Sequence, residues 1–291
     1  MTFANPFEAP GQWLKANLHT HSTQSDGDTT PAERALQYRD AGYDVLAITD
    51  HRTVTVLEGE GPEGLLVIPS LEAHPACPGA SVYHLVCLNV PADFEYNEEQ
   101  PAQEMIDGVR TAGGDVIFAH PYWCGHSAEQ IRCLDGLIGV EVYNATCTKI
   151  GKGDSSVVWD YLLAGGTWLP AVAVDDVHRG RDIFMGWTMI KAAERSTDAV
   201  MSALRAGSYY ASSGPQIDDF RVEGGNVTLR CSPVREIHFM CRCSAGRCFY
   251  ADPGEALTSA DAELAPSVGY VRAQIVDDLG RRAWTNPVAL G

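Results

Sequence analysis

Two pairs of side chains that can bind metals, each spaced two residues apart, stand out in this 291-residue sequence. His19 and His21 directly follow an apolar segment, and Asp176 and His178 follow a later one. Side chains two apart in an extended chain point to the same side, so both members of a pair can reach one ion. Imidazole and carboxylate are ligands of first-row divalent metals. The spacing therefore predicts a metal site.

Other candidate ligands lie near the ends of further apolar segments. They are Asp26, His51, Glu72, His84 and His120. Burying such groups together without a cation would be costly, because they would lose their hydration. We therefore interpret the whole set as one metal centre built from distant parts of the chain. His84 fits less simply because it lies near the start of its predicted strand. It joins the others only if that strand runs differently from the rest or has other bounds.

Short apolar runs alternate with helical segments over the first two thirds of the chain. The runs predict strands over residues 14–18, 45–48, 65–70, 82–88, 116–119, 140–143, 169–174 and 185–191. Helices are predicted from Pro31 to before Gly42 and over residues 101–112, 155–164 and 197–206. Such alternation indicates a parallel sheet. The number of strands favours a barrel over the alternative of an open sheet, and barrel enzymes collect their functional residues at the carboxyl ends of the strands.

The pattern changes after Gly214-Pro215, where hairpins without helices begin. One hairpin joins residues 220–223 to 227–231 through Gly224-Gly225, a tight-turn signal. Two more are predicted over residues 236–251 and 270–284. We therefore expect an α/β unit over residues 1–212 and a small antiparallel β domain over residues 213–291.

The amino-acid composition argues against long nucleic acids and membranes as binding partners. The chain has 21 Lys and Arg against 38 Asp and Glu, a net charge of −17, so it would repel a long nucleic acid. The sequence has no apolar run of about 18 residues, and we expect no membrane partner. Nine cysteines without a visible secretory signal indicate reduced thiols and a cytoplasmic location. The oligomeric state stays open.

A family resemblance follows from these residues. Taken in order, the sequence motifs resemble those of the PHP (polymerase and histidinol phosphatase) family of metal-dependent phosphoesterases: Leu18-His19-Thr20-His21 with Ser25-Asp26-Gly27, Ile48-Thr49-Asp50-His51, Glu72, His84, Ala119-His120-Pro121 and Asp176-Val177-His178. The match covers about residues 14–180. Residues 207–215 and the β tail are similar to a subgroup that also includes carbamate hydrolases.

The resemblance implies a distorted (β/α)7 barrel with two or three divalent ions, Mn, Fe or Zn. One ion would take His19, His21, Glu72 and Asp176; a second would share Glu72 and add His84 and His120; a third would take Asp26, His51 and His178. Some family members have histidine in place of Asp26, and an oxygen ligand there favours Mn²⁺ or Fe²⁺ over Zn²⁺.

Several neighbours of these ligands have open roles. Asp175 is an alternative to Asp176, but the two-residue spacing to His178 favours Asp176. Asp50 is expected either to accept a proton from a ligand imidazole or to make a turn hydrogen bond. Glu141 and Asn144 end a predicted strand and are interpreted as structural, with a contact to the ligands or substrate as the alternative. His74 is interpreted in the same two ways.

The chemistry of such a centre is hydrolysis. Two ions bridged by a carboxylate trap a water between them and lower its pKa, so that hydroxide can attack at neutral pH. They also polarise a phosphoryl or carbonyl oxygen. A guanidinium matches two phosphate oxygens, so Arg179, beside His178, is the first candidate to bind phosphate and assist catalysis. Arg52, Arg181 and Lys149 are further candidates for substrate binding. His126 or Tyr122 could protonate the leaving group.

We therefore expect a metal-dependent hydrolase, a phosphoesterase that cleaves a small phosphate monoester or diester with a metal-bridged hydroxide. Nucleotide-derived esters are among the candidate substrates. Hydrolysis of a carbamate, amide or carboxylic ester at the same site is the first alternative. A non-catalytic binding module that metals stabilise is the second.

Overall fold

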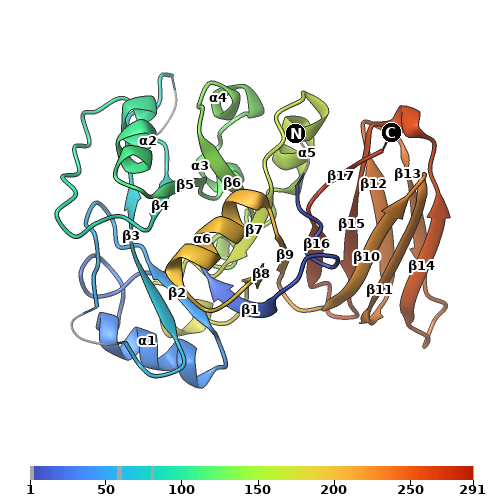
Figure 1. Cartoon of the computed structure of the whole chain (residues 1–291), viewed down its shortest axis with the longest axis horizontal. Coiled ribbons are helices and arrows are strands. Elements are labelled where there is room, and N and C mark those ends of the chain that lie inside the picture. Colours follow the sequence, from blue (N-terminus) through green and yellow to red (C-terminus); the bar gives the residue numbers. More distant parts are fainter. Residues whose placement is uncertain (1–2, 58–60, 80–81, 291) are drawn as a thin grey trace.

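The structure is a computed structural model that describes residues 3–57, 61–79 and 82–290. Figure 1 shows strands and helices alternating through the first two thirds of the chain, followed by a tail of strands at one end of the long axis. The helices are α1 (Pro31–Asp40), α2 (Ala102–Thr111), α3 (Pro121–Cys124), α4 (Ala128–Arg132), α5 (Ser156–Ala164) and α6 (Thr197–Ala206).

The strands of the first part are β1 (Gln12–Asn17), β2 (Val45–Ile48), β3 (Leu66–Ala73), β4 (Leu85–Leu88), β5 (Asp115–Phe118), β6 (Leu137–Asn144), β7 (Ala171–Val174), β8 (Trp187–Ala192) and β9 (Tyr209–Ser212). Those of the tail are β10 (Ile217–Glu223), β11 (Asn226–Val234), β12 (Glu236–Cys241), β13 (Gly246–Tyr250), β14 (Leu257–Glu263), β15 (Tyr270–Val276), β16 (Arg282–Thr285) and β17 (Val288–Ala289). The mixed α/β class and the antiparallel tail are thus confirmed.

Strands β1, β2 and β3 pair in parallel, and so do β5, β6 and β7. Between these sets, β4 runs antiparallel to both β3 and β5, and β8 runs antiparallel to β1. The sheet is therefore mixed rather than wholly parallel as the alternation predicted. Reversal of β4 brings its first residues to the edge at which β3 and β5 end.

The first and last of the strands β1–β7 approach each other at that same edge. Beyond β1 and β7, Thr20 and Val177 form a parallel bridge. The Asp176 N–H donates to the His19 carbonyl at 3.0 Å, and the His21 N–H donates to the Val177 carbonyl at 3.0 Å. The strand order nevertheless ends at β7, with no ladder from β7 to β1 among the described residues. The predicted closed barrel is not confirmed.

Helix formation follows the local sequence. Thr30 caps the N-terminus of α1. Its side chain accepts from the Glu33 N–H, while the Glu33 carboxylate accepts from the Thr30 backbone N–H. Pro31 at the first helical position fits this capping box, as predicted. α6 places Val200 and Leu204 in one buried apolar cluster with strand residues such as Ile190. No helix among the described residues is long and apolar enough to cross a membrane.

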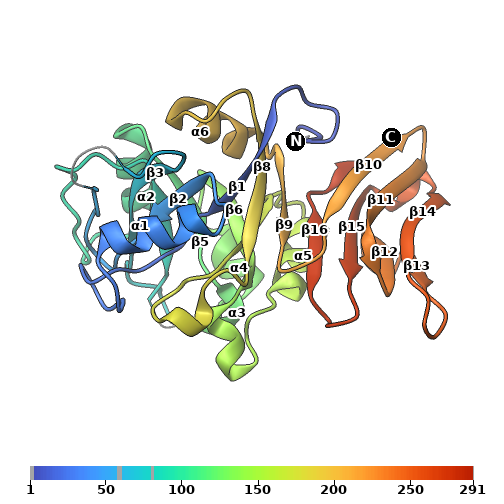
Figure 2. The ribbon, with the colours of Figure 1, turned by 90° about the horizontal axis from the view of Figure 1, so that it is seen from below.

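The tail continues the main sheet. β9 pairs with β8 on one side and with β16 on the other, and the order runs on through β15 and β12 to β13. A second sheet, β10-β11-β14, shares a buried cluster with it, in which Phe220 and Leu229 pack with Phe239 and Ile275. Figure 2 shows these two layers beside β9. The three predicted hairpins are present, whereas β9 and β14 were not predicted. A domain boundary at residue 213 stays a prediction.

Candidate metal centre

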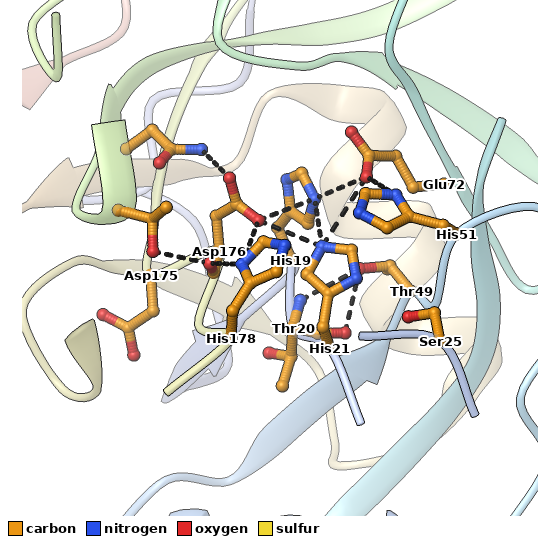
Figure 3. Close-up of polar contacts among 12 residues, drawn as sticks. His19, Thr20, His21, Ser25, Thr49, His51, Glu72, Asp175, Asp176 and His178 are labelled. Carbon is orange, nitrogen blue, oxygen red and sulfur yellow. Dashed lines mark hydrogen bonds and ion pairs between the residues drawn. The ribbon is translucent and has the colours of Figure 1, made fainter. Parts of the chain in front are cut away.

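The nine predicted metal ligands lie together at the edge where β1, β2, β3, β5 and β7 end. Figure 3 shows His19, His21, His51, Glu72, Asp176 and His178 arranged around one region, whereas Asp175 lies apart from them. His84 reaches the same region because it immediately precedes the reversed strand β4. Of the two conditions stated for His84, the first therefore holds: its strand runs in the opposite direction to its neighbours.

The first donor group comprises His19, His21, Glu72 and Asp176, all buried. Asp176 Oδ1 lies 3.3 Å from His19 Nε2 and 3.0 Å from His21 Nε2. Glu72 Oε2 lies 3.5 Å from His19 Nε2 and 3.6 Å from His21 Nε2. Four donor atoms therefore face one another at separations that suit ligands of a common ion.

The second donor group comprises Glu72, His84 and His120. Glu72 Oε1 lies 2.7 Å from His84 Nδ1 and 3.3 Å from His120 Nε2. Glu72 thus turns one carboxylate oxygen to the first donor group and the other to the second. This is the arrangement expected of a carboxylate shared by two ions.

The third donor group comprises Asp26, His51 and His178. Asp26 Oδ1 lies 3.5 Å from Nε2 of His51 and 3.5 Å from Nε2 of His178. Its side chain is 55% exposed, so this group is the most open of the three. His21 Nδ1 lies 3.9 Å from the same Asp26 oxygen and connects this group to the first.

Two buried atoms in the cluster indicate that a cation belongs there. Among the described residues, Glu72 Oε2 and His21 Nδ1 have no hydrogen-bond partner. Leaving a buried carboxylate oxygen unsatisfied is costly, and a divalent cation would satisfy it. The donor set of imidazole and carboxylate fits Mn, Fe or Zn.

The carboxylates and imidazoles of the cluster shift one another's pKa values. Burial alone would raise the pKa of Glu72, but the imidazoles of His19, His120 and His51 outweigh it and hold that pKa well below its usual value. Burial lowers the pKa of His21 to about 4. The contact with the His51 ring, 3.5 Å away, lowers the pKa of Asp26 to about 2, against a smaller effect of burial. The carboxylates are therefore ionised and His21 is neutral at pH 7. Burial alone would lower the pKa of His51 and of His19, but neighbouring carboxylates outweigh it and raise that of His51 to about 9 and that of His19 well above its usual value. Binding of a cation would therefore release protons from these two rings.

Glu141 and Asn144 contact the ligands directly. The His19 Nδ1–H donates to Glu141 Oε1 at 2.6 Å, which leaves Nε2 of His19 to face the first donor group. Glu141 Oε2 accepts from the His120 backbone N–H at 2.8 Å and from Asn144 Nδ2 at 2.9 Å. Asn144 Nδ2 also donates to Asp176 Oδ2 at 3.0 Å. These contacts orient three ligands, so the interpretation as purely structural strand-end residues was wrong.

Asp175 and Asp176 have different roles. The Asp175 carboxylate is buried and accepts from Asn17, Tyr38 and the backbone N–H groups of residues 184–186. Burial raises its pKa to about 6 against these hydrogen bonds. Asp176 faces the donor groups from a left-handed backbone conformation with φ of 54°, a strained position of the kind found at functional sites. Asp176 is therefore the candidate ligand, as predicted.

Asp50 has no hydrogen bond with an imidazole among the described residues. It accepts from the Ser22 N–H and hydroxyl and from the hydroxyls of Ser25 and Thr55. These four bonds fill the capacity of its carboxylate and fix the segment that leads from His21 to Asp26. Of its two predicted roles, the turn hydrogen bond is the one found; the catalytic role stays a prediction that these contacts do not support.

A cavity of about 520 Å³ opens over the donor groups. Besides ligands and His74, it is lined by Trp123, Thr146, Cys147, Lys149, Arg179 and Arg181. Lys149 Nζ lies 2.5 Å from Asp182 Oδ2, so part of its charge is compensated. Arg179 and Arg181 are exposed on the wall. Three of the four predicted substrate-binding residues are thus brought together here.

Arg52 and His126 do not line this cavity. Arg52 lies beside Glu98, with Nε 3.2 Å from Oε2. His126 is buried, its Nε2 donates to the Val82 carbonyl at 3.2 Å, and its ring packs against Tyr83. These contacts lie away from the cavity and do not support the predicted roles of the two residues, which stay predictions. Tyr122, the other acid considered, also lies outside the residues that line the cavity.

Two further residues contact the ligands: His74, for which the sequence left such a contact as the alternative, and Cys124, which was not predicted. His74 Nε2 lies 3.0 Å from His51 Nδ1, and Cys124 Sγ lies 3.4 Å from His120 Nδ1. His74 repeats the two-residue spacing of the other pairs, now with Glu72, which was the available signal. Cys124 follows His120 by four residues in a short helix, a weaker signal that was not used.

Comparisons with known proteins support the fold. No family model and no curated protein matches the sequence. A solved two-domain protein from Bacteroides vulgatus, described as containing a predicted PHP-like metal-dependent phosphoesterase, is similar over 95% of this chain and 94% of that chain, with a TM-score of 0.56 and 17% identity. This similarity spans both parts of the chain and shows a PHP-like fold, as the motifs predicted.

Two further solved structures are similar over shorter regions. An amidohydrolase from Chromobacterium violaceum matches 57% of this chain and 89% of that chain, with a TM-score of 0.44 and 15% identity. A lesion-specific endonuclease from Pyrococcus furiosus matches 67% of this chain and 56% of that chain, with a TM-score of 0.48 and 13% identity.

Proposed function

We propose that this chain, whose fold is PHP-like, is a metal-dependent hydrolase that cleaves a small phosphate ester. The observation that carries the proposal is a single cavity that combines the three donor groups with Lys149, Arg179 and Arg181. In this proposal β1–β7 form a distorted barrel whose edge is joined by the bridge between Thr20 and Val177.

The nine ligands would hold two or three divalent ions, with Glu72 shared by the first two donor groups and Asp26 in the third. Such ions supply Lewis acidity, which lowers the pKa of water and polarises a phosphoryl oxygen. The chain itself orients the ligands. Glu141 fixes the ring of His19, and Asn144 holds Asp176. Preorganised ligands of this kind lower the cost of reaching the transition state.

The cationic wall of the cavity would bind the phosphate. The chain carries a net charge of −17, so an anionic substrate would be repelled unless cations were concentrated at its site. Arg179 follows the candidate ligand His178 and lines the cavity. Its guanidinium, which can donate two parallel hydrogen bonds to a phosphate, therefore lies next to the candidate metal ligands. Asp182 pairs with Lys149 and lies 3.8 Å from Nε of Arg181, so Arg179 is the cation of this wall that would contribute most to binding the substrate.

The test compares substrates on the metal-loaded protein. We expect turnover of p-nitrophenyl phosphate or bis(p-nitrophenyl) phosphate that is lost on chelation and restored by Mn²⁺. Glu72→Gln should abolish it, because Glu72 contacts ligands of both donor groups. Glu236→Gln is the matched control, since Glu236 lies in the tail beside His238.

The same assay distinguishes the alternatives. Hydrolysis of a p-nitrophenyl carboxylic ester or carbamate without either phosphate ester would favour the alternative that the β tail suggests, with Trp123 as the apolar wall of the cavity. Bound metal without turnover of any of these substrates would contradict catalysis and favour a binding module.

A further inference from the structure

We propose that His74 is a positioning residue that fixes the ring of His51 and thereby controls the third donor group. Its imidazole lies just beyond the end of β3 and is nearly buried, with 9% of the residue exposed. The backbone N–H of His74 donates to the Tyr96 hydroxyl at 2.9 Å. This inference rests on the proposed metal-binding function and concerns one of its three donor groups.

The direction of the His51 ring carries the assignment. His51 Nδ1 lies 2.7 Å from Glu72 Oε2 and 3.0 Å from His74 Nε2. Glu72 Oε2 is closer and forms an ion pair with the His51 ring, but it has no aligned hydrogen bond among the described residues, whereas the contact with His74 has hydrogen-bond geometry. The Nδ1–H of His51 therefore donates to His74, and Glu72 Oε2 remains available to a cation.

Two other candidate ligands show the same organisation. His19 donates through Nδ1 to Glu141, and His178 donates through Nδ1 to the Asp176 carbonyl at 2.8 Å. Each is left with a lone pair on Nε2 that faces a donor group. His51 follows the same rule when its Nδ1–H donates to His74, the aligned acceptor, and its Nε2 then faces Asp26 at 3.5 Å.

Packing holds His74 in this role and connects two donor groups. Its ring lies against the ring of His84, with centroids 4.1 Å apart and planes inclined by 30°. His84 belongs to the second donor group, so a single side chain supports His51 by a hydrogen bond and His84 by packing.

The nature of the acceptor predicts an order of affinities. His19 donates to a carboxylate, which raises the basicity of its other nitrogen, whereas His51 donates to an uncharged imidazole nitrogen. The third donor group also contains the exposed Asp26. We therefore expect the third ion to be the weakest bound, and His74 to matter for that ion in particular.

The experiment measures Mn²⁺ binding to the full chain from the electron paramagnetic resonance signal of free Mn²⁺. Asp26→Asn should weaken binding only at the third donor group, so the part of the Mn²⁺ binding curve that it changes is assigned to that group. His74→Phe, which removes the acceptor, should weaken that same ion by about 10- to 100-fold and leave the tighter ions unchanged. His74→Gln, whose amide oxygen can occupy the place of Nε2, should restore binding to within about threefold of the wild type.

His238→Phe is the matched control, because His238 lies in the tail beside Glu236. His74→Leu replaces His74→Phe if the latter does not fold. Unchanged binding of the third ion in both apolar variants would overturn the assignment. Equal weakening of all ions, or a glutamine variant as defective as phenylalanine, would also overturn it, since either result indicates packing alone. A wild-type chain that binds no Mn²⁺ would instead overturn the proposed function, and this inference with it.

Discussion

At the scale of single residues, the centre depends on side chains whose hydrogen bonds fix the orientation of the candidate ligands. Glu141 shows this clearly, because Oε1 accepts from His19 while Oε2 accepts from the His120 backbone and from Asn144. Both oxygens accept hydrogen bonds. Replacing Glu141 by glutamine keeps the shape of the side chain but puts an NH₂ group, which can only donate, opposite an existing donor.

We accordingly predict that Glu141→Gln weakens metal binding by about 10- to 100-fold, as changes to groups that orient ligands usually do. The measurement is competition with a chromophoric chelator. Glu236→Gln should match the wild type. An unchanged affinity in Glu141→Gln would contradict the orienting role of Glu141.

Arg179 supports a second prediction at this scale. Arg179→Ala should lower kcat/KM for a phosphate ester by about 10- to 100-fold, since a hydrogen bond to a charged group contributes about 1.5–3 kcal/mol. Metal content should stay unchanged, because Arg179 is not among the donors. Steady-state kinetics with metal analysis provide the measurement, and Arg195→Ala is the control because Arg195 pairs with Asp44. Equal kinetics in the two variants would remove Arg179 from substrate binding.

The predicted ligands lie together in the structure, whereas some of the groups predicted around them lie elsewhere. Pairs such as His19 and His21 could be placed from local sequence, because a two-residue spacing after a strand already determines where both side chains point. Arg52 and His126 could not be placed in this way, because each follows a strand end by several residues, where the direction of a side chain depends on tertiary contacts. Arg52 has a φ of 60°, a turn that no local pattern signalled.

At the scale of elements, the direction of β4 decides whether the second donor group exists. A parallel β4 would place His84 at the opposite edge of the sheet from Glu72. The sequence could not decide this, because apolar runs have the same appearance in either direction. β14 was missed for a related reason, since its exposed residues lack an apolar run.

Asp175 is the clearest link between elements. Oδ2 accepts from Asn17, Tyr38 and the Phe184 N–H, and Oδ1 accepts from the N–H groups of Met185 and Gly186. It thus joins β1 and α1 to the segment that follows Arg181. Whichever oxygen an amide nitrogen replaced, at least two buried donors would lose their acceptor.

Asp175→Asn should therefore lower the free energy of unfolding by about 2 kcal/mol, the order expected for buried donors left without an acceptor. Urea unfolding at pH 7 measures it. Asp278→Asn is the control, since Asp278 is exposed in the turn after β15. If both variants unfold at the same urea concentration, Asp175 does not anchor that segment.

At the scale of the whole molecule, the first part and the tail share both a sheet and a core. β9 pairs with β16, and Trp284 and Tyr270 of the tail belong to the same apolar cluster as Trp159 of α5. The buried Arg272 of β15 also contacts Asp160 of α5 through both nitrogens of its fork, at 2.7–2.9 Å. The sequence predicted the tail from its hairpins but not this continuity, because β9 had no separate signal.

A chain truncated after Ser212 should consequently not fold as a stable monomer. It would expose the edge of β9 and the apolar surface that Trp284 covers, which favours aggregation. Size-exclusion chromatography and thermal unfolding against the full chain test this. A truncated monomer with a single cooperative transition would show that the two parts are independent domains.

Glu72 has a consequence for how the centre is filled. The two oxygens of Glu72 face different donor groups. Removing an ion from one group would leave more of the carboxylate's negative charge for the ion in the other group, which would then be bound more tightly. Occupancy of the two groups is thus thermodynamically linked. Stripping the centre with a chelator should proceed in ordered stages, and constants measured for each ion alone should not add up to the constant for the pair.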